Sequence, residues 1–302
     1  MSISQYIKEI GRGRDGARAL DRAQATDLMG RVLDGAVSDL ELGAFCIAMR
    51  IKGETAEEMA GFLDATHARL NRIPAHSPVV ALPSYNGARK LPVLTPLLAH
   101  LLAREGFAVV IHGTATESSR ITSQEVLSAM GVQALTQVRA VLTGEVIYAP
   151  TEVLSPGLKR LLDVRRSVGL RNPGHSLVKL MNPTTANDAL LISSYTHPEY
   201  AVSMAATFQL TGARGLLLRG TEGEVVADAR RTPQMDVFVH GTRTASVEAQ
   251  TGSLLKLPEL PTDIDAASTA RYTQDVLAGK LPVPVPLQTQ VQAALKAFTL
   301  PL

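Results

Sequence analysis

Short apolar runs alternate with helical segments along the chain from Val79 onwards, and this alternation is the strongest constraint on the fold. Strands are expected at 79–82, 108–111, 189–194, 215–218 and 236–239. Helices are expected at 94–104, 122–130, near 199–211, and at 267–277 and 287–297. Strands that alternate with helices favour a mostly parallel sheet covered by helices on both faces. The sequence therefore predicts a large α/β domain.

The residues before Val79 lack this alternation and have a helical pattern instead. Apolar residues recur there at helical spacing, at Leu40, Ala44, Ile47 and Ile51. A short linker that contains Pro74 separates this part from the first strand. We therefore expect a small all-helical domain at 1–72, completed by part of the helical segment 150–185, and an α/β domain at 73–302.

The segment Pro83–Lys90, with the sequence PSYNGARK, joins the first expected strand to the following helix. A strand–turn–helix junction of this kind presents backbone N–H groups to anions. Arg89 and Lys90 add positive charge to it. The segment has one glycine, Gly87, whereas a tight pyrophosphate loop needs several. The sequence thus indicates an anion-binding scaffold whose small-molecule cradle has changed.

A second concentration of positive charge lies between Lys159 and Lys179. Six basic residues and one acidic residue give this segment a net charge of +5, while the whole chain carries +2. Together with Arg89, Lys90 and Arg120, such a segment is suited to neutralise several phosphates. An ordinary solvated helical face is the alternative explanation of the charge run.

Two further side chains near the junction have two interpretations each. Tyr85 is either a platform on which a nucleic-acid base stacks or a ring that covers an emptied pocket. His112, at the end of an expected strand, is either an acid–base group or a packed histidine, and the packed histidine is favoured.

The cysteine content and the lengths of the apolar stretches indicate the cellular compartment of the protein. The single cysteine, Cys46, excludes an internal disulfide and a cysteine metal cage, and it fits a reducing compartment. No apolar stretch approaches the length that spans a membrane, and no signal peptide is visible. We expect a cytoplasmic protein without membrane contact.

The N-terminal runs Asp39–Phe45 and Arg50–Thr55 resemble those of anthranilate phosphoribosyltransferase and its relatives. The pairs His112-Gly113, Asn182-Pro183 and Ala278-Gly279 follow in the order of that family, so the resemblance covers nearly the whole chain. It implies the nucleoside phosphorylase/phosphoribosyltransferase-like fold, in which a small helical domain accompanies an α/β domain with a mostly parallel central sheet.

The catalytic signatures of that family are not retained. Its GTGGD loop, which holds phosphoribosyl pyrophosphate, falls on residues 83–87 and keeps none of its five positions. Its adjacent Asp-Glu pair, which holds magnesium, falls on Val225 and Val226, and valine cannot ligate a hard cation that requires oxygen donors. We therefore expect no catalytic residue, no metal ligand and no cofactor. Arg89, Lys90 and Arg120 could nevertheless replace the metal as fixed positive charges, so an enzyme with another substrate stays an alternative.

The combination of PSYNGARK with VIHG at 110–113 and RIKGE at 50–54 resembles the YbiB family within this superfamily. That resemblance implies a homodimer that binds DNA with little sequence preference. The expected phosphate contacts are Asn86, Arg89, Lys90, Arg120, Arg165, Arg166, Arg171 and Lys179. A glycosyl- or phosphoribosyltransferase with an altered substrate is the alternative, and a dimeric scaffold for another acidic partner is a third.

Overall fold

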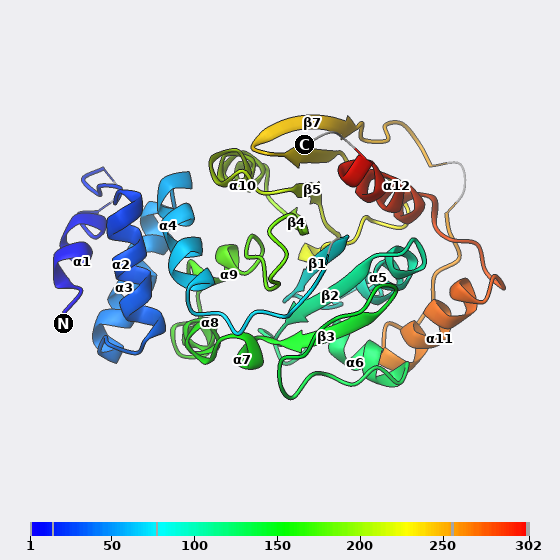
Figure 1. Cartoon of the computed structure of the whole chain (residues 1–302), viewed down its shortest axis with the longest axis horizontal. Helices are drawn as coiled ribbons and strands as arrows, with labels where there is room; N and C mark the ends of the chain where they lie inside the picture. Colours follow the sequence, from blue (N-terminus) through cyan, green and yellow to red (C-terminus); the bar gives the residue numbers. More distant parts are fainter. Residues whose placement is uncertain (1, 14, 77, 255–256, 300–302) are drawn as a thin grey trace. The chain divides into compact units, whose positions relative to one another are not determined.

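The computed structural model describes residues 2–13, 15–76, 78–254 and 257–299 (Figure 1). Its internal contacts divide the chain into two compact units. The first, the helical unit, comprises Met1–Asn71 and Thr151–Met181, and the second, the α/β unit, comprises Arg72–Pro150 and Asn182–Leu302. The predicted fold class, a helical domain and an α/β domain with a mostly parallel sheet, is confirmed.

The helical unit consists of the helices α1 (Ser4–Ile10), α2 (Arg22–Leu33), α3 (Asp39–Lys52), α4 (Ala56–His67), α7 (Thr151–Leu154), α8 (Pro156–Val168) and α9 (Gly174–Leu177). The first part of the α/β unit, Arg72–Pro150, intervenes in the sequence between α4 and α7. Helices α2, α3 and α4 each begin at a capping box, in which an N-cap side chain and the third helical residue satisfy each other's backbone N–H. Asp21, Ser38 and Thr55 are the N-cap residues.

Gly61 allows helix α4 to lie against helix α2. A Cβ atom at this position would lie 2.4 Å from the carbonyl oxygen of Arg22 and 2.8 Å from the Cβ of Ala25. We expect Gly61→Ala to lower the free energy of unfolding by about 1–3 kcal/mol, because the added methyl overpacks this contact. Thermal unfolding would measure the change. Gly43→Ala is the control: nothing lies within 4 Å of its added Cβ, so helix propensity should leave the protein as stable or up to about 1 kcal/mol more stable.

The α/β unit is built around a seven-stranded sheet in the order β3-β2-β1-β4-β5-β6-β7. Its strands are β1 (Val79–Ser84), β2 (Ala108–Gly113), β3 (Val146–Pro150), β4 (Leu190–Tyr195), β5 (Gly215–Arg219), β6 (Met235–Val239) and β7 (Thr242–Val247). The first five strands of that order are parallel, and β6 and β7 are antiparallel to their neighbours. The helical elements of the unit are α5 (Thr95–Arg104), α6 (Ser123–Ala129), α10 (Pro198–Thr211), η1 (Thr221–Gly223), α11 (Ala266–Leu277) and α12 (Val285–Thr299).

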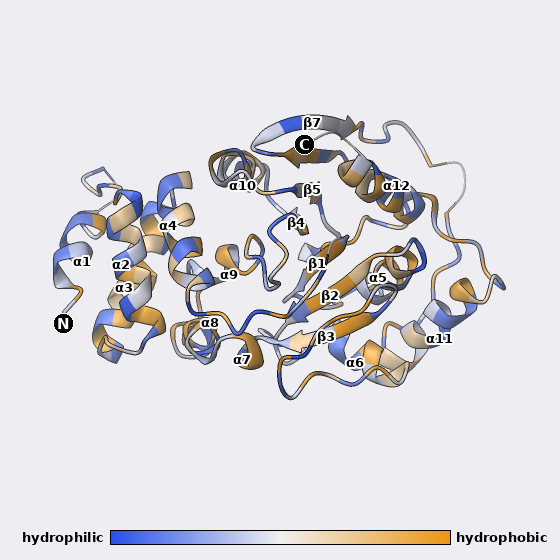
Figure 2. Ribbon diagram, in the orientation of Figure 1, coloured by the Kyte–Doolittle hydropathy of each residue, from blue (hydrophilic) through white to orange (hydrophobic). Residues whose placement is uncertain are grey.

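The two faces of the sheet are covered by different helices. Alternate strand residues such as Val80, Leu82 and Ile111 form one core with apolar residues of α5, α11 and α12. On the other face Phe208 of α10 stacks on Phe238 of β6, with ring centroids 5.4 Å apart. The hydropathy colouring of Figure 2 shows hydrophobic residues along the central strands. Both faces of the sheet are therefore buried at the strands β1, β2, β4 and β5, as the unbroken apolar runs of the sequence predict.

The carboxyl ends of the parallel strands meet at one edge of the sheet. Ser84 at the end of β1 pairs with Gly113 of β2, and Tyr195 of β4 pairs with Arg219 of β5. Ligands of open α/β sheets bind at this edge, so the loops that follow β1 and β5 are where a site is expected. None of the helices in the described residues combines the length and the apolar character that crossing a bilayer requires.

Candidate functional site

The loop that follows β1 receives a carboxylate from the loop that follows β5. Glu224 Oε1 accepts the backbone N–H groups of Asn86 at 2.8 Å and Gly87 at 2.9 Å. Its Oε2 accepts the hydroxyl groups of Ser84 at 2.6 Å and Thr95 at 3.0 Å. Glu224 is buried, with 2% of its surface exposed. The backbone donors predicted for an external anion are thus bound to an anion of the chain itself.

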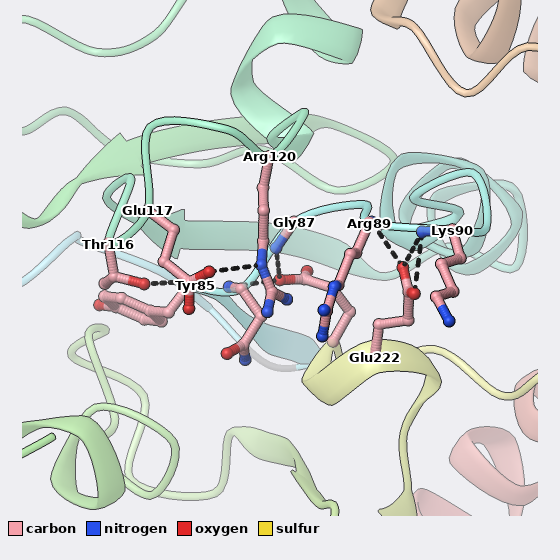
Figure 3. A network of polar contacts seen from close by, with 10 residues as sticks. Tyr85, Gly87, Arg89, Lys90, Thr116, Glu117, Arg120 and Glu222 are labelled. Carbon is pink, nitrogen blue, oxygen red and sulfur yellow. Dashed lines mark hydrogen bonds and ion pairs between the residues drawn. The ribbon is translucent and has the colours of Figure 1, made fainter. Parts of the chain in front are cut away.

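A second carboxylate serves the next part of the same loop. Glu222 accepts the backbone N–H groups of Arg89 at 2.6 Å and Lys90 at 2.9 Å, and that of Leu91 at 3.4 Å (Figure 3). Residue 222 has a φ of 53°, in the left-handed region that side chains other than glycine rarely adopt. Two acidic side chains from one short segment therefore accept the hydrogen bonds of five backbone N–H groups of the loop.

The side chains of Arg89 and Lys90 are left for other partners. Both residues are exposed, and the described part of the chain offers neither side chain a hydrogen bond or an ion pair. Figure 3 shows both side chains extending away from the loop backbone that Glu222 holds. These two cations are the part of the loop that a solute anion reaches.

Asn86 and Arg120 lie in the same cluster but are less accessible. Asn86 is 7% exposed, and its side-chain amide donates to the carbonyl oxygen of Gly223 at 2.8 Å. Arg120 donates through Nε to Glu117 at 2.9 Å, and 13% of its side chain is exposed. The structure thus brings Asn86, Arg89, Lys90 and Arg120 together, and it gives Asn86 a role inside the loop; the phosphate contact of Asn86 stays a prediction.

Tyr85 and His112 pack against each other inside the α/β unit. The Tyr85 hydroxyl lies 3.1 Å from His112 Nδ1, and the two rings meet edge to face with centroids 5.7 Å apart. Tyr85 is only 6% exposed, so the hypothesis that it stacks on a base is wrong. His112 is fully buried, which confirms the interpretation as a packed histidine. This burial lowers its pKa to about 3, so its imidazole is neutral at pH 7.

The positions of the magnesium-binding pair belong to the core. Val225 and Val226 are 0% and 1% exposed and pack with residues of the central sheet. Their side chains offer no oxygen ligand, and their backbone carbonyl oxygens accept hydrogen bonds from Gln290 and Thr221, so these residues do not fit a magnesium ion. Among the described residues no group of three or more His, Cys, Asp or Glu side chains is arranged to hold a metal ion.

The other predicted phosphate contacts belong to the helical unit, and three of them interact electrostatically with a buried histidine. Burial lowers the pKa of His175 to about 4, and the positive charges of Arg171, Arg165 and Lys179 contribute further to this decrease. These three cations are therefore near enough to His175 to disfavour its protonation. Arg166 is the most exposed of the set, with 66% of its side chain accessible.

Part of the positive charge of this segment is balanced internally. Asp163 forms ion pairs with Lys159 and with Arg166, the latter at 3.4 Å. Arg160 donates to the carbonyl oxygen of Val32. The segment is thus neither a fully free cationic surface nor a fully neutralised one.

This architecture is similar to that of known proteins. Residues 4–69 match the helical bundle domain of the glycosyl transferase family. The structure is similar to anthranilate phosphoribosyltransferase (TrpD) from Thermus thermophilus, with a TM-score of 0.74, 24% identity, and coverage of 97% of this chain and 87% of that one. It also resembles the Saccharomyces cerevisiae anthranilate phosphoribosyltransferase that was solved with PRPP and Mg, with a TM-score of 0.67 and 15% identity over 94% of this chain and 84% of that one.

Sequence relatives decide the family. The uncharacterized protein YbiB of Escherichia coli (strain K12) is 40% identical over 98% of this chain and 94% of its own length. The chain belongs to the YbiB family of the anthranilate phosphoribosyltransferase-like superfamily. Anthranilate phosphoribosyltransferase of Anaeromyxobacter sp. (strain K) is more distant, at 29% identity over 92% of this chain and 83% of that protein. The predicted superfamily is therefore confirmed.

Glu222 and Glu224 are the site residues that sequence reasoning missed. They lie 131 to 138 positions from the backbone groups that they bind. A signal was present in the sequence, because Thr221–Glu224 follows an expected strand and two acidic residues there flank a glycine. Parallel strands that end at one sheet edge bring such a segment close to the loop after another strand.

Proposed function

We propose that this member of the YbiB family binds DNA through the phosphate backbone, with little preference for base sequence. The observation that carries the proposal is the exposure of Arg89 and Lys90. They lie on a loop that does not retain the glycine-rich sequence with which the catalytic family holds its substrate. Cations that face solvent from a fixed backbone are suited to phosphate contacts, which position nucleic acid without reading its sequence. A cytoplasmic location is part of the proposal.

The helical unit supplies the second support. Arg165, Arg171 and Lys179 lie close enough to His175 to lower its pKa, and Arg166 is exposed beside them. Charges of one sign that converge on one region raise the local concentration of an anionic partner. Fluorescence anisotropy with labelled duplexes of unrelated sequence tests the function, and the expected result is a similar dissociation constant on each.

A homodimer is also part of the proposal. Helix α3 carries an apolar stripe at helical spacing, in which Leu40 is 84% exposed and Ile51 is 61% exposed, with Ala44 and Ile47 between them. Large apolar side chains grouped on one exposed helix face are typical of an interface with another chain.

We expect Leu40→Asp combined with Ile51→Asp to convert the dimer to a monomer, because two carboxylates would have to be desolvated in the interface. Light scattering after size-exclusion chromatography measures the mass. Val202→Asp combined with Val285→Asp is the control, since these residues are 73% and 67% exposed and lie outside α3. A parent protein that stays monomeric at micromolar concentration, or an α3 variant that stays dimeric, would contradict the proposal.

A transferase with an altered substrate is the alternative function. Its support is the fold, which it shares with the anthranilate phosphoribosyltransferases. Transfer from a pyrophosphate donor needs the charge of the leaving group to be neutralised, usually by magnesium. The buried side chains of Val225 and Val226 cannot bind the magnesium ion that would do this. The DNA-binding proposal is therefore preferred.

A further inference from the structure

The loop between β1 and α5 has the form of an anion-binding site. Backbone N–H groups of neighbouring residues that converge on one point make a concavity that binds anions. Two such sets converge here, one from Asn86 and Gly87 and the other from Arg89, Lys90 and Leu91. Each set converges on a carboxylate that belongs to the chain.

The segment that carries these carboxylates is shaped to fit the loop. Glu222 adopts a φ of 53° and a ψ of 20°, an unfavourable conformation for a residue with a side chain. Gly223 follows with a φ of 91°, and a Cβ there would lie 2.8 Å from the side-chain amide nitrogen of Asn86. The hydrogen bonds between the carboxylates and the loop offset this backbone strain.

We propose that the loop of residues 84–91 is an anion site kept filled by Glu222 and Glu224, so that free phosphate groups are excluded from its backbone N–H groups. A free phosphate would have to displace a carboxylate that is tethered beside the loop. The effective concentration of a tethered group is high, so a weakly binding free anion loses this competition. The inference does not depend on DNA binding, because it concerns the backbone donors and not the exposed side chains.

Replacement of Glu222 by glycine frees one of the two sets of backbone N–H groups. The substitution removes the carboxylate from the N–H groups of Arg89, Lys90 and Leu91, and it relieves the positive φ at the same time. His240→Gly is the matched control, because His240 is the other non-glycine residue with a positive φ in the described chain and is exposed in the turn between β6 and β7. It relieves the same kind of strain without opening an anion site.

The experiment titrates the full-length proteins with inorganic phosphate against sodium chloride of equal ionic strength. With phosphate at ten times its dissociation constant, the Tm of the Glu222→Gly variant should rise by about 3 °C relative to chloride. The parent protein and His240→Gly should show a clearly smaller difference, because their backbone N–H groups stay bound to Glu222. In heteronuclear NMR spectra, the amide signals of Arg89, Lys90 and Leu91 should move much further with phosphate in the Glu222→Gly variant than in the parent or His240→Gly, in which phosphate reaches only the exposed side chains of Arg89 and Lys90.

Two results would overturn the proposal. The first is a parent protein whose amide signals at Arg89, Lys90 and Leu91 respond to phosphate as strongly as those of the variant. The second is a Glu222→Gly variant that is folded and does not respond to phosphate. If this variant is unfolded in buffer, phosphate should restore its circular dichroism spectrum, and failure to restore it counts against the proposal equally.

Discussion

Incubated with phosphoribosyl pyrophosphate, anthranilate and magnesium, the purified protein should form no product at an enzymatic rate. The loop donors that would contact a pyrophosphate are bound to Glu222 and Glu224, and buried valines stand at positions 225 and 226. Removal of a single preorganised donor from an active site lowers the rate by about 10²- to 10³-fold. Loss of the whole set should therefore lower the rate by many powers of ten.

Release of pyrophosphate, followed by a coupled assay, measures this activity. An active anthranilate phosphoribosyltransferase, assayed in the same buffer, serves as the positive control. Turnover of about 1 s⁻¹ or faster, the range of ordinary enzymes, would show that other residues replace the missing groups. The transferase alternative would then be preferred to the DNA-binding proposal.

Reversal of charge at Arg89 and Lys90 should weaken DNA binding on every sequence tested. The Arg89→Glu and Lys90→Glu double variant removes two exposed cations and leaves the backbone N–H groups of the loop with Glu222. We expect the affinity to fall by about 10- to 100-fold at 0.1 M salt, and the log–log salt slope to become shallower by about 2. Fluorescence anisotropy with two unrelated duplexes measures both quantities.

A control variant with the same change in charge separates local from global electrostatics. Lys8 and Lys296 are exposed, and their side chains make no hydrogen bond or ion pair within the described residues. The Lys8→Glu and Lys296→Glu double variant should lose much less affinity. Equal losses in the two double variants would show that net charge, and not the loop, governs binding.

Local patterns in the sequence predicted most of the fold. The expected strands at 79–82 and 108–111 lie within β1 and β2, because both are unbroken apolar runs ended by turns. Strand β3 was missed because Val146–Pro150 runs directly into helix α7, without a turn that would mark the end of a strand. Strand β7 was missed because Thr242–Val247, the edge strand, carries mostly polar residues and is largely exposed, so it lacks the apolar run that marks the buried strands.

The candidate site was predictable only in part. Arg89 and Lys90 were found because they lie in a recognisable strand–turn–helix junction. The carboxylates that occupy the junction come from residues more than 130 positions away, and no local pattern states which loops meet. Tyr85 shows the same limit, because its burial against His112 depends on the pairing of β1 with β2 and on side-chain direction.

The central claim is that exposed cations of this fold bind DNA through its phosphates. The most direct test is the affinity of the parent protein for duplex DNA between 50 and 200 mM salt. With about four to six phosphate contacts, the log–log slope should be roughly −4 to −5, so affinity should fall by about 250- to 1000-fold over this range, with little difference between sequences. The absence of binding at 50 mM salt, or an affinity that ignores salt, would contradict the claim.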